Sequence, residues 1–164
     1  MDAVKFEDFN ALVSMEYDEQ ASAFCGHDYW QVTEAFRYYF DDASLNTYVE
    51  VPVGYLSDGA SVPRIFWGLL PAWGAYGQAA VLHDYLCEHL TQIKNGQTVT
   101  ITRKQADDAF KDACVALDVP RWKRNIMFIA IAVYVYVKNI TGVEIDAKKA
   151  EYLAQNPNAT ATLP

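Results

Sequence analysis

The stretch AAVLHDYL, residues 79–86, decides the fold, because its apolar residues recur at helical spacing around a histidine. The same periodicity extends over about residues 75–91, so the sequence predicts a helix there. His83 falls on the buried stripe of that helix, and Asp84 lies one position round, at the edge of the stripe. The helix therefore presents two polar side chains that point in different directions.

A second helix is expected after a connection that contains the turn dipeptide Asn95-Gly96. It begins at Thr102, which forms a capping box with Gln105, and its buried stripe contains Asp107. Two antiparallel helices joined by a short connection would place Asp107 opposite His83.

The segment before the first helix predicts a β-hairpin. Residues 30–40 favour a strand, residues 41–44 a turn, and residues 48–55 a returning strand at a sheet edge. The hairpin leads into a polar loop over residues 57–64. We therefore expect an α+β fold, with an N-terminal β-hairpin packed on a core of three main helices.

Length and charge set the organisation of the chain. Its 164 residues suffice for one domain. We expect an acidic, loosely held arm over residues 1–28, a single globular domain over residues 29–142, and a C-terminal extension with a short helix and a frayed tail over residues 143–164. The net charge of −8 argues against nucleic acid as a partner, since phosphate binding needs a basic field. No basic-then-apolar secretory signal opens the chain, which predicts synthesis and folding in a cytoplasm.

The third main helix, over about residues 122–139, carries the longest apolar run. This run, residues 126–137, is well short of the roughly 20 residues that a transmembrane helix needs, so no transmembrane span is expected. We expect a buried core helix. The alternative is that Trp122 and its basic neighbours contact an interface of anionic lipid.

The polar residues suggest metal-assisted hydrolysis. A histidine such as His83 suits a general base at neutral pH, and a carboxylate from Asp107 would orient its ring. Asp84 can join Asp58 in holding a hard cation. Ca²⁺ suits such a site because it takes about 6–8 oxygen ligands, including loop carbonyls such as that of Gly59. The cation would polarise a carbonyl or phosphoryl oxygen of the substrate.

Each of these residues also has a structural interpretation. A lone histidine on an apolar helix face is usually a hydrogen-bonded core residue. Arg64 could clamp a substrate, but such an arginine more often pairs with a structural acid. Ser61 could be a nucleophile, yet it lacks a nucleophile elbow and is better interpreted as a loop cap.

Four segments together resemble an uncharacterised phage and prophage family, the domain of unknown function 1353, across about residues 30–135. They are residues 51–55, 57–64, 79–86 and 106–110. The resemblance implies a viral origin, often near tail or lysis functions. It also implies synthesis in a host cytoplasm, incorporation in the virion, and phage structural proteins as partners.

A more remote resemblance is to the small secreted bacterial and fungal phospholipases A2. It rests on Asp58-Gly59-Ala60-Ser61 with Pro63, on His83-Asp84-Tyr85, and on Asp107 with Phe110. It implies a phospholipase A2-like helix pair, His83 as base, Asp107 as its partner, and Asp58 and Asp84 as calcium ligands. The chain differs from that family in its lack of the family's disulfides.

The leading hypothesis is a phage-encoded, phospholipase A2-like, calcium-assisted hydrolase of lipid or another cell-envelope ester or amide. The alternative is a non-enzymatic virion, tail or assembly protein that uses the polar cluster as scaffolding. A zinc-dependent peptidoglycan hydrolase ranks last, because such enzymes more often use several His or Cys ligands and only His83 is well placed.

Overall fold

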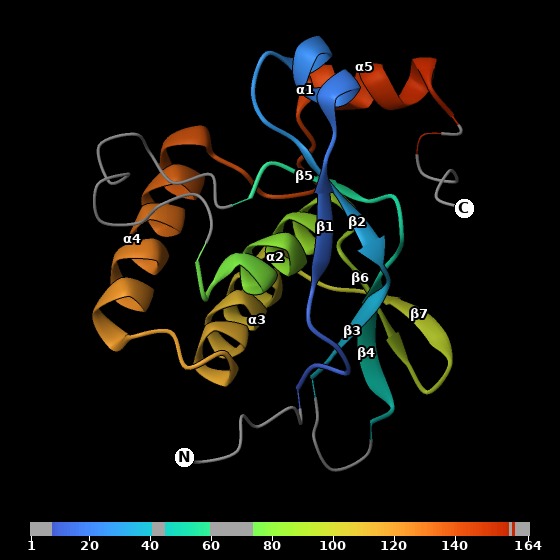
Figure 1. Cartoon of the computed structure of the whole chain (residues 1–164). Helices are drawn as coiled ribbons and strands as arrows, with labels where there is room; N and C mark the ends of the chain where they lie inside the picture. Colours follow the sequence, from blue (N-terminus) through green and yellow to red (C-terminus); the bar gives the residue numbers. More distant parts are fainter. Residues whose placement is uncertain (1–7, 41–44, 60–73, 158, 160–164) are drawn as a thin grey trace.

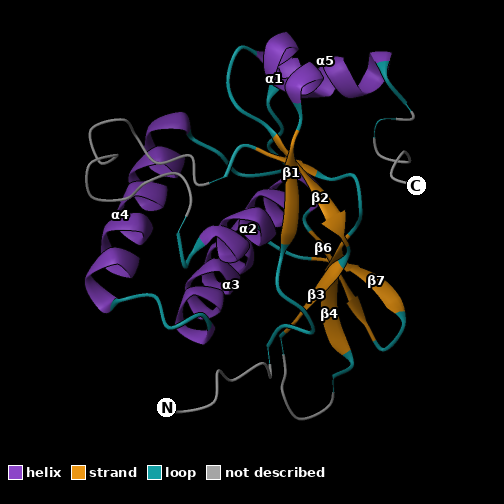
Figure 2. Cartoon of the chain, viewed as in Figure 1, coloured by secondary structure: helices purple, strands orange, loops and turns teal. Residues whose placement is uncertain are grey.

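The computed structural model describes residues 8–40, 45–59, 74–157 and 159. Within these residues the fold is mixed α+β, with five helices and two small antiparallel sheets (Figures 1 and 2). The strands are β1 (Ser14–Tyr17), β2 (Trp30–Glu34), β3 (Phe36–Tyr39), β4 (Thr47–Val51), β5 (Leu56–Ser57), β6 (Thr91–Lys94) and β7 (Gln97–Thr100). The helices are α1 (Glu19–Cys25), α2 (Gly77–His89), α3 (Arg103–Ala116), α4 (Arg121–Lys138) and α5 (Ala147–Gln155).

The predicted β-hairpin is present as β3 and β4, but the segment before it belongs to a different sheet. β3 pairs with β4 in a sheet of order β3-β4-β6-β7, whereas β2 lies between β1 and β5. Glu34 explains the break. In one unbroken strand its carboxylate would share a face with the buried Val32 and Phe36, and an unpaired buried charge is costly. The chain interrupts the strand at Ala35, and Glu34 stays exposed.

The Asn95-Gly96 turn was correctly predicted. Both residues have positive φ, +50° and +77°, as a two-residue hairpin turn requires, and they join β6 to β7. Tyr48 of β4 pairs with Ile93 of β6, so the connection between α2 and α3 extends the sheet.

The N-terminal residues are more ordered than the expected loose arm. β1 pairs with β2, and Phe9 is buried against the rings of Phe36 and Tyr38. Asp18 does not serve as a solvated charge, because its carboxylate caps α1 by accepting a hydrogen bond from the backbone N–H of Ala21. Residues 8–28 are therefore part of the folded unit.

The C-terminal extension joins these N-terminal residues. The predicted short helix forms as α5, and it packs against α1 (Figure 1). Tyr152 of α5 lies in a small buried cluster with Ala21, Cys25 and Leu56. Two segments far apart in sequence thus form one lobe of the molecule.

The helix pair α2 and α3 forms the centre of the main core. The capping box that was expected at Thr102 and Gln105 is present at the start of α3. Val81, Leu82 and Leu86 of α2 are fully buried. The pair is therefore a rigid platform for the polar residues that it carries.

The expectation that the third main helix is a buried core helix was wrong. Of the residues of α4, Met127 is buried, whereas Ile129 is 63% exposed and Val133 is 55% exposed. α4 lies at the side of the α2–α3 pair and contacts it with one face, so its opposite face has no protein to cover it among the described residues. No helix in the described part of the chain has the length and apolarity to cross a membrane.

Candidate active site

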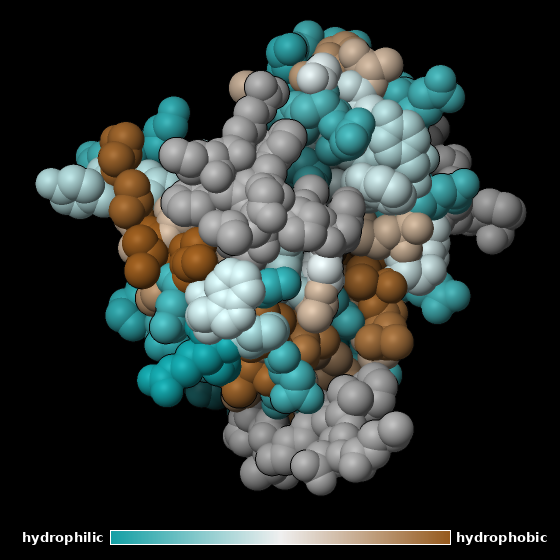
Figure 3. Space-filling view, turned by 60° about the vertical axis from the view of Figure 1, so that its left-hand side comes forward, coloured by the Kyte–Doolittle hydropathy of each residue, from teal (hydrophilic) through white to brown (hydrophobic). Residues whose placement is uncertain are grey.

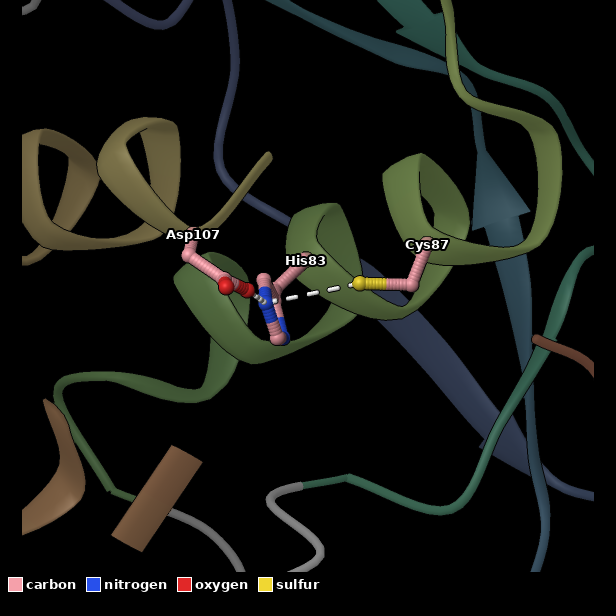
Figure 4. Close-up of side chains that lie close together, drawn as sticks. All are labelled: His83, Cys87 and Asp107. Atoms are coloured by element: carbon pink, nitrogen blue, oxygen red, sulfur yellow. Dashed lines mark hydrogen bonds and ion pairs between the residues drawn. The ribbon is translucent and has the colours of Figure 1, made fainter. Parts of the chain in front are cut away.

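His83 and Asp107 meet between α2 and α3, as the sequence predicted. His83 Nε2 lies 2.7 Å from Asp107 Oδ1 (Figure 4). The His83 residue is 9% exposed, so the contact is largely shielded from solvent. The antiparallel register that the capping box and the helical periodicity imply is sufficient to bring the two side chains together.

Arg103 holds the carboxylate of Asp107 from one turn earlier on α3. Its Nε donates to Asp107 Oδ1 at 3.3 Å, and its Nη1 donates to Glu144 Oε2 at 3.0 Å. The hydroxyl of Tyr134 on α4 donates to Glu144 Oε1 at 2.6 Å. Asp107 thus links His83 to a chain of hydrogen bonds that continues through Arg103 and Glu144 to Tyr134.

Cys87 also reaches this histidine, because its Sγ lies 3.4 Å from His83 Nε2. The ligand atoms of His83, Cys87 and Asp107 lie within 4.8 Å of one another, so these residues form a group that could hold a metal ion. The four-residue spacing of His83 and Cys87 on one helix was the signal that could have found it.

Cys87 does not fit the role of a nucleophile activated by His83. Burial raises the pKa of the Cys87 thiol, which disfavours the reactive thiolate. Asp107 and Cys87 also approach the same ring nitrogen, Nε2 (Figure 4). In a nucleophile–histidine–aspartate triad the carboxylate and the nucleophile bind opposite nitrogens. The arrangement therefore favours a base–carboxylate dyad or a metal group.

A cavity of about 470 Å³ lies against His83. Its lining includes the polar residues Ser57, Asp58, Asp84, Glu88, Arg103 and Glu144 and the apolar residues Phe110, Met127, Ala130 and Ile131. Asp107 is not among the described residues that line it, so this carboxylate lies behind His83. With Nε2 directed at Asp107, Nδ1 is the nitrogen of His83 that remains to act on a bound molecule.

The end of β5 brings the expected cation ligands to the same cavity. Ser57 Oγ donates to Asp84 Oδ2 at 2.7 Å, and the backbone N–H of Gly59 donates to Ser57 Oγ at 3.1 Å. Gly59 has a φ of +78°, a conformation that favours glycine. Burial raises the pKa of Asp84 well above its usual value, and the nearby charge of Asp58 raises it further. The fold thus keeps two carboxylates close enough to repel each other.

His27 is a member of this group that the sequence did not reveal. Its Nε2 lies 3.8 Å from Asp58 Oδ2. Arg64 and Ser61, the other two predicted site residues, lie outside the described residues.

Lys149 of α5 supplies a buried positive charge to the cavity. Its ammonium is 2.6 Å from Glu88 Oε1, donates to the carbonyl oxygen of Leu56, and lies 4.2 Å from the centre of the Tyr55 ring. Burial raises the pKa of Glu88, and Lys149 opposes that effect. Lys149 was missed because α5 is remote in sequence and carries no motif.

The donor atoms fit two kinds of cation. Asp58 and Asp84 offer hard oxygen ligands beside the Ser57 hydroxyl, as Ca²⁺ prefers, and a cation there would relieve their repulsion. His83, Cys87 and Asp107 offer nitrogen, sulfur and oxygen, which suit Zn²⁺ better.

Comparison with known proteins places these features in a family. The chain is 38% identical over 86 residues to an uncharacterised protein of Sinorhizobium fredii (strain NBRC 101917 / NGR234), a match that covers 51% of this chain and 23% of that protein. No solved structure matches the chain. A family model described as "Protein of unknown function (DUF1353)" matches residues 30–131, which contain β2 through most of α4 and both members of the dyad. The chain belongs to this DUF1353 family.

Proposed function

We propose that the protein is a phospholipase A2-like, calcium-assisted hydrolase of phage origin that acts on lipid or another cell-envelope ester or amide. The observation that carries the proposal is the 2.7 Å contact between His83 and Asp107 at the wall of a cavity. The acidic pair of Asp58 and Asp84 on the same cavity supports a cation. We propose synthesis in a host cytoplasm and carriage in the virion.

The residues around the cavity supply the parts of a hydrolytic step. A water molecule at His83 Nδ1 would give its proton to the ring as its oxygen adds to the substrate carbonyl. The imidazolium would then return that proton to the leaving alkoxide or amine as the ester or amide bond breaks. Asp107 would stabilise the resulting imidazolium through Nε2, and Arg103 would hold that carboxylate in position. When bound by Asp58 and Asp84, Ca²⁺ would polarise the oxygen of the scissile group.

The apolar residues of the cavity favour a substrate with a hydrocarbon part. Phe110, Met127 and Ile131 line the cavity together with its polar residues. An acyl chain would lie against these apolar residues while its ester carbonyl lies at His83. This mixed lining favours a lipid over a purely polar substrate such as a glycan.

The direct test is release of fatty acid from phospholipid vesicles, with Ca²⁺ or with a chelator. We expect calcium-dependent release that falls by on the order of 10² or more in His83→Asn, because general-base catalysis is removed. His89→Asn is the matched control, since His89 lies on the same helix but is solvent-exposed. The absence of release from any wild-type incubation, or equal release by wild type and His83→Asn, contradicts the proposal.

A second candidate is a non-enzymatic virion, tail or assembly protein in which the cluster is scaffolding. The hydrogen bonds that run from Asp107 through Arg103 and Glu144 to Tyr134 favour it, because they tie α3, the segment of Glu144 and α4 together whether or not a reaction occurs. In that case His83→Asn would lower the melting temperature or prevent particle assembly, and no turnover would be found for the wild type.

A further inference from the structure

The charge of α4 is opposite to that of the molecule as a whole. The helix contains Arg121, Lys123, Arg124 and Lys138 and no acidic residue, in a chain with a net charge of −8. The three basic residues at its start flank Trp122, which is 50% exposed. One helix therefore concentrates positive charge on an otherwise acidic protein.

The outer face of α4 is also apolar. Trp122, Ile129, Val133, Tyr136 and Val137 recur at helical spacing and form a stripe along it. Tyr136 is 87% exposed and Val137 is 71% exposed. Figure 3 brings this side of the molecule forward and shows hydrophobic residues at the surface. An exposed apolar stripe of this kind usually indicates a binding surface, because an ordinary solvent-facing helix carries mostly polar side chains on its outer face.

The opposite face of the same helix lines the cavity. Met127, Ala130, Ile131 and Tyr134 point toward it, so α4 has one apolar face inward and one outward. With 18 residues, and with its basic residues at the two ends, the helix suits a position along a surface rather than across a bilayer.

We propose that the outer face of α4 docks on the surface of an anionic phospholipid bilayer. Arg121 and Lys123 would contact the negatively charged headgroups, Trp122 would lie at the level of the headgroups, and Val133 and Val137 would enter the boundary of the acyl chains. Charge complementarity selects this partner, because the rest of the acidic molecule would be repelled by the same membrane. Docking requires no turnover, so it does not depend on the proposed hydrolysis.

The test is flotation of the full chain with vesicles of phosphatidylcholine and phosphatidylglycerol in equal amounts, and with vesicles of phosphatidylcholine alone. We expect binding to the anionic vesicles, weakened by salt because the attraction between charges is screened. Arg121→Glu should reduce partitioning by about 25-fold, since each unit of charge near an anionic surface is worth about fivefold. Val133→Asp should also abolish most binding, because a charge replaces an apolar contact with the acyl chains.

Matched controls lie on other surfaces. Val115→Asp places the same charge on an exposed valine of α3, and Lys94→Glu reverses a basic residue on β6. Both should bind the vesicles as the wild type does, apart from a small uniform effect of net charge. His83→Asn should bind normally too, which separates docking from hydrolysis.

Three results would overturn the docking proposal. The first is that the wild type binds neutral and anionic vesicles equally. The second is that Val133→Asp and Val115→Asp lose binding to the same extent. The third is that the wild type binds no vesicles and is a dimer, which Val133→Asp converts to a monomer. The last result, measured by light scattering, would assign the stripe to a second copy of this chain.

Discussion

Asp107 is the residue whose removal best separates catalysis from scaffolding. Asp107→Asn keeps a side chain of the same size that can still hydrogen-bond to His83, but it removes the negative charge that would stabilise an imidazolium. We expect kcat for fatty-acid release to fall by on the order of 10²–10⁴ with little change in KM. Steady-state kinetics with circular dichroism as a folding control would measure this.

A scaffolding role predicts a different result for Asp107→Asn. The melting temperature would fall because Arg103 loses one of its two charged partners, and any basal activity would be unaffected. A large fall in melting temperature at constant kcat would therefore reject the assigned role.

Lys149 and Glu88 form a buried ion pair that should be costly to break. The Lys149 side chain is 3% exposed and that of Glu88 is 12% exposed. Lys149→Met would leave the Glu88 carboxylate without its partner, and we expect the free energy of unfolding to fall by about 3 kcal/mol. Urea unfolding would measure this. In the double variant Glu88→Gln with Lys149→Met much of the stability should return, and failure to recover would mean that the lost contact with Leu56 dominates.

The start of α3 carries both the cap and the dyad. Thr102 accepts a hydrogen bond from the backbone N–H of Gln105, and Asp107 lies in the next turn. Thr102→Ala should lower the free energy of unfolding by about 1 kcal/mol. Thermal unfolding would measure it, with Thr98→Ala on the exposed side of β7 as the control. Equal effects of the two variants would argue against the cap.

Local patterns predicted those elements whose causes are local. Helical spacing and a capping box fixed the positions of His83 and Asp107 on α2 and α3, and Asn95-Gly96 marked its hairpin, because each depends on neighbouring residues. Lys149 could not be predicted in this way, since its partner Glu88 is 61 positions away and an isolated lysine carries no signal.

The assignment of α4 failed for a related reason. Apolar content indicated burial, but sequence periodicity does not show whether another element exists to cover each face. The outward stripe of Ile129 and Val133 has the same composition as a core face. The basic cluster at Arg121 was the better indicator of the surface position that the structure shows.

The molecule as a whole holds its three cysteines as thiols with low reactivity. Cys25, Cys87 and Cys114 are all buried and free. Burial raises the pKa of each thiol, that of Cys114 to about 12, so the thiolate fraction of each near pH 8 is lower than that of an ordinary cysteine. We expect a thiol reagent to label the native protein slowly at pH 8 and faster as the pH rises.

Unfolding in denaturant should make all three thiols react rapidly, since it removes the burial that raises their pKa. Mass spectrometry after timed labelling would identify the modified positions. Rapid labelling of Cys87 in the native protein would mean that its thiol is activated, and this would restore it as a candidate nucleophile.

The joining of α1 to α5 has a consequence for the design of fragments. The segment that the family model matches, residues 30–131, contains His83, Asp107, Asp58 and Glu88 but not Lys149. A fragment cut to those limits would lose β1, α1 and α5, and the cavity would lose a wall and its resident ammonium. Expression work and the transfer of this site to another scaffold should therefore keep β1, α1 and α5 together with the segment that the family model matches.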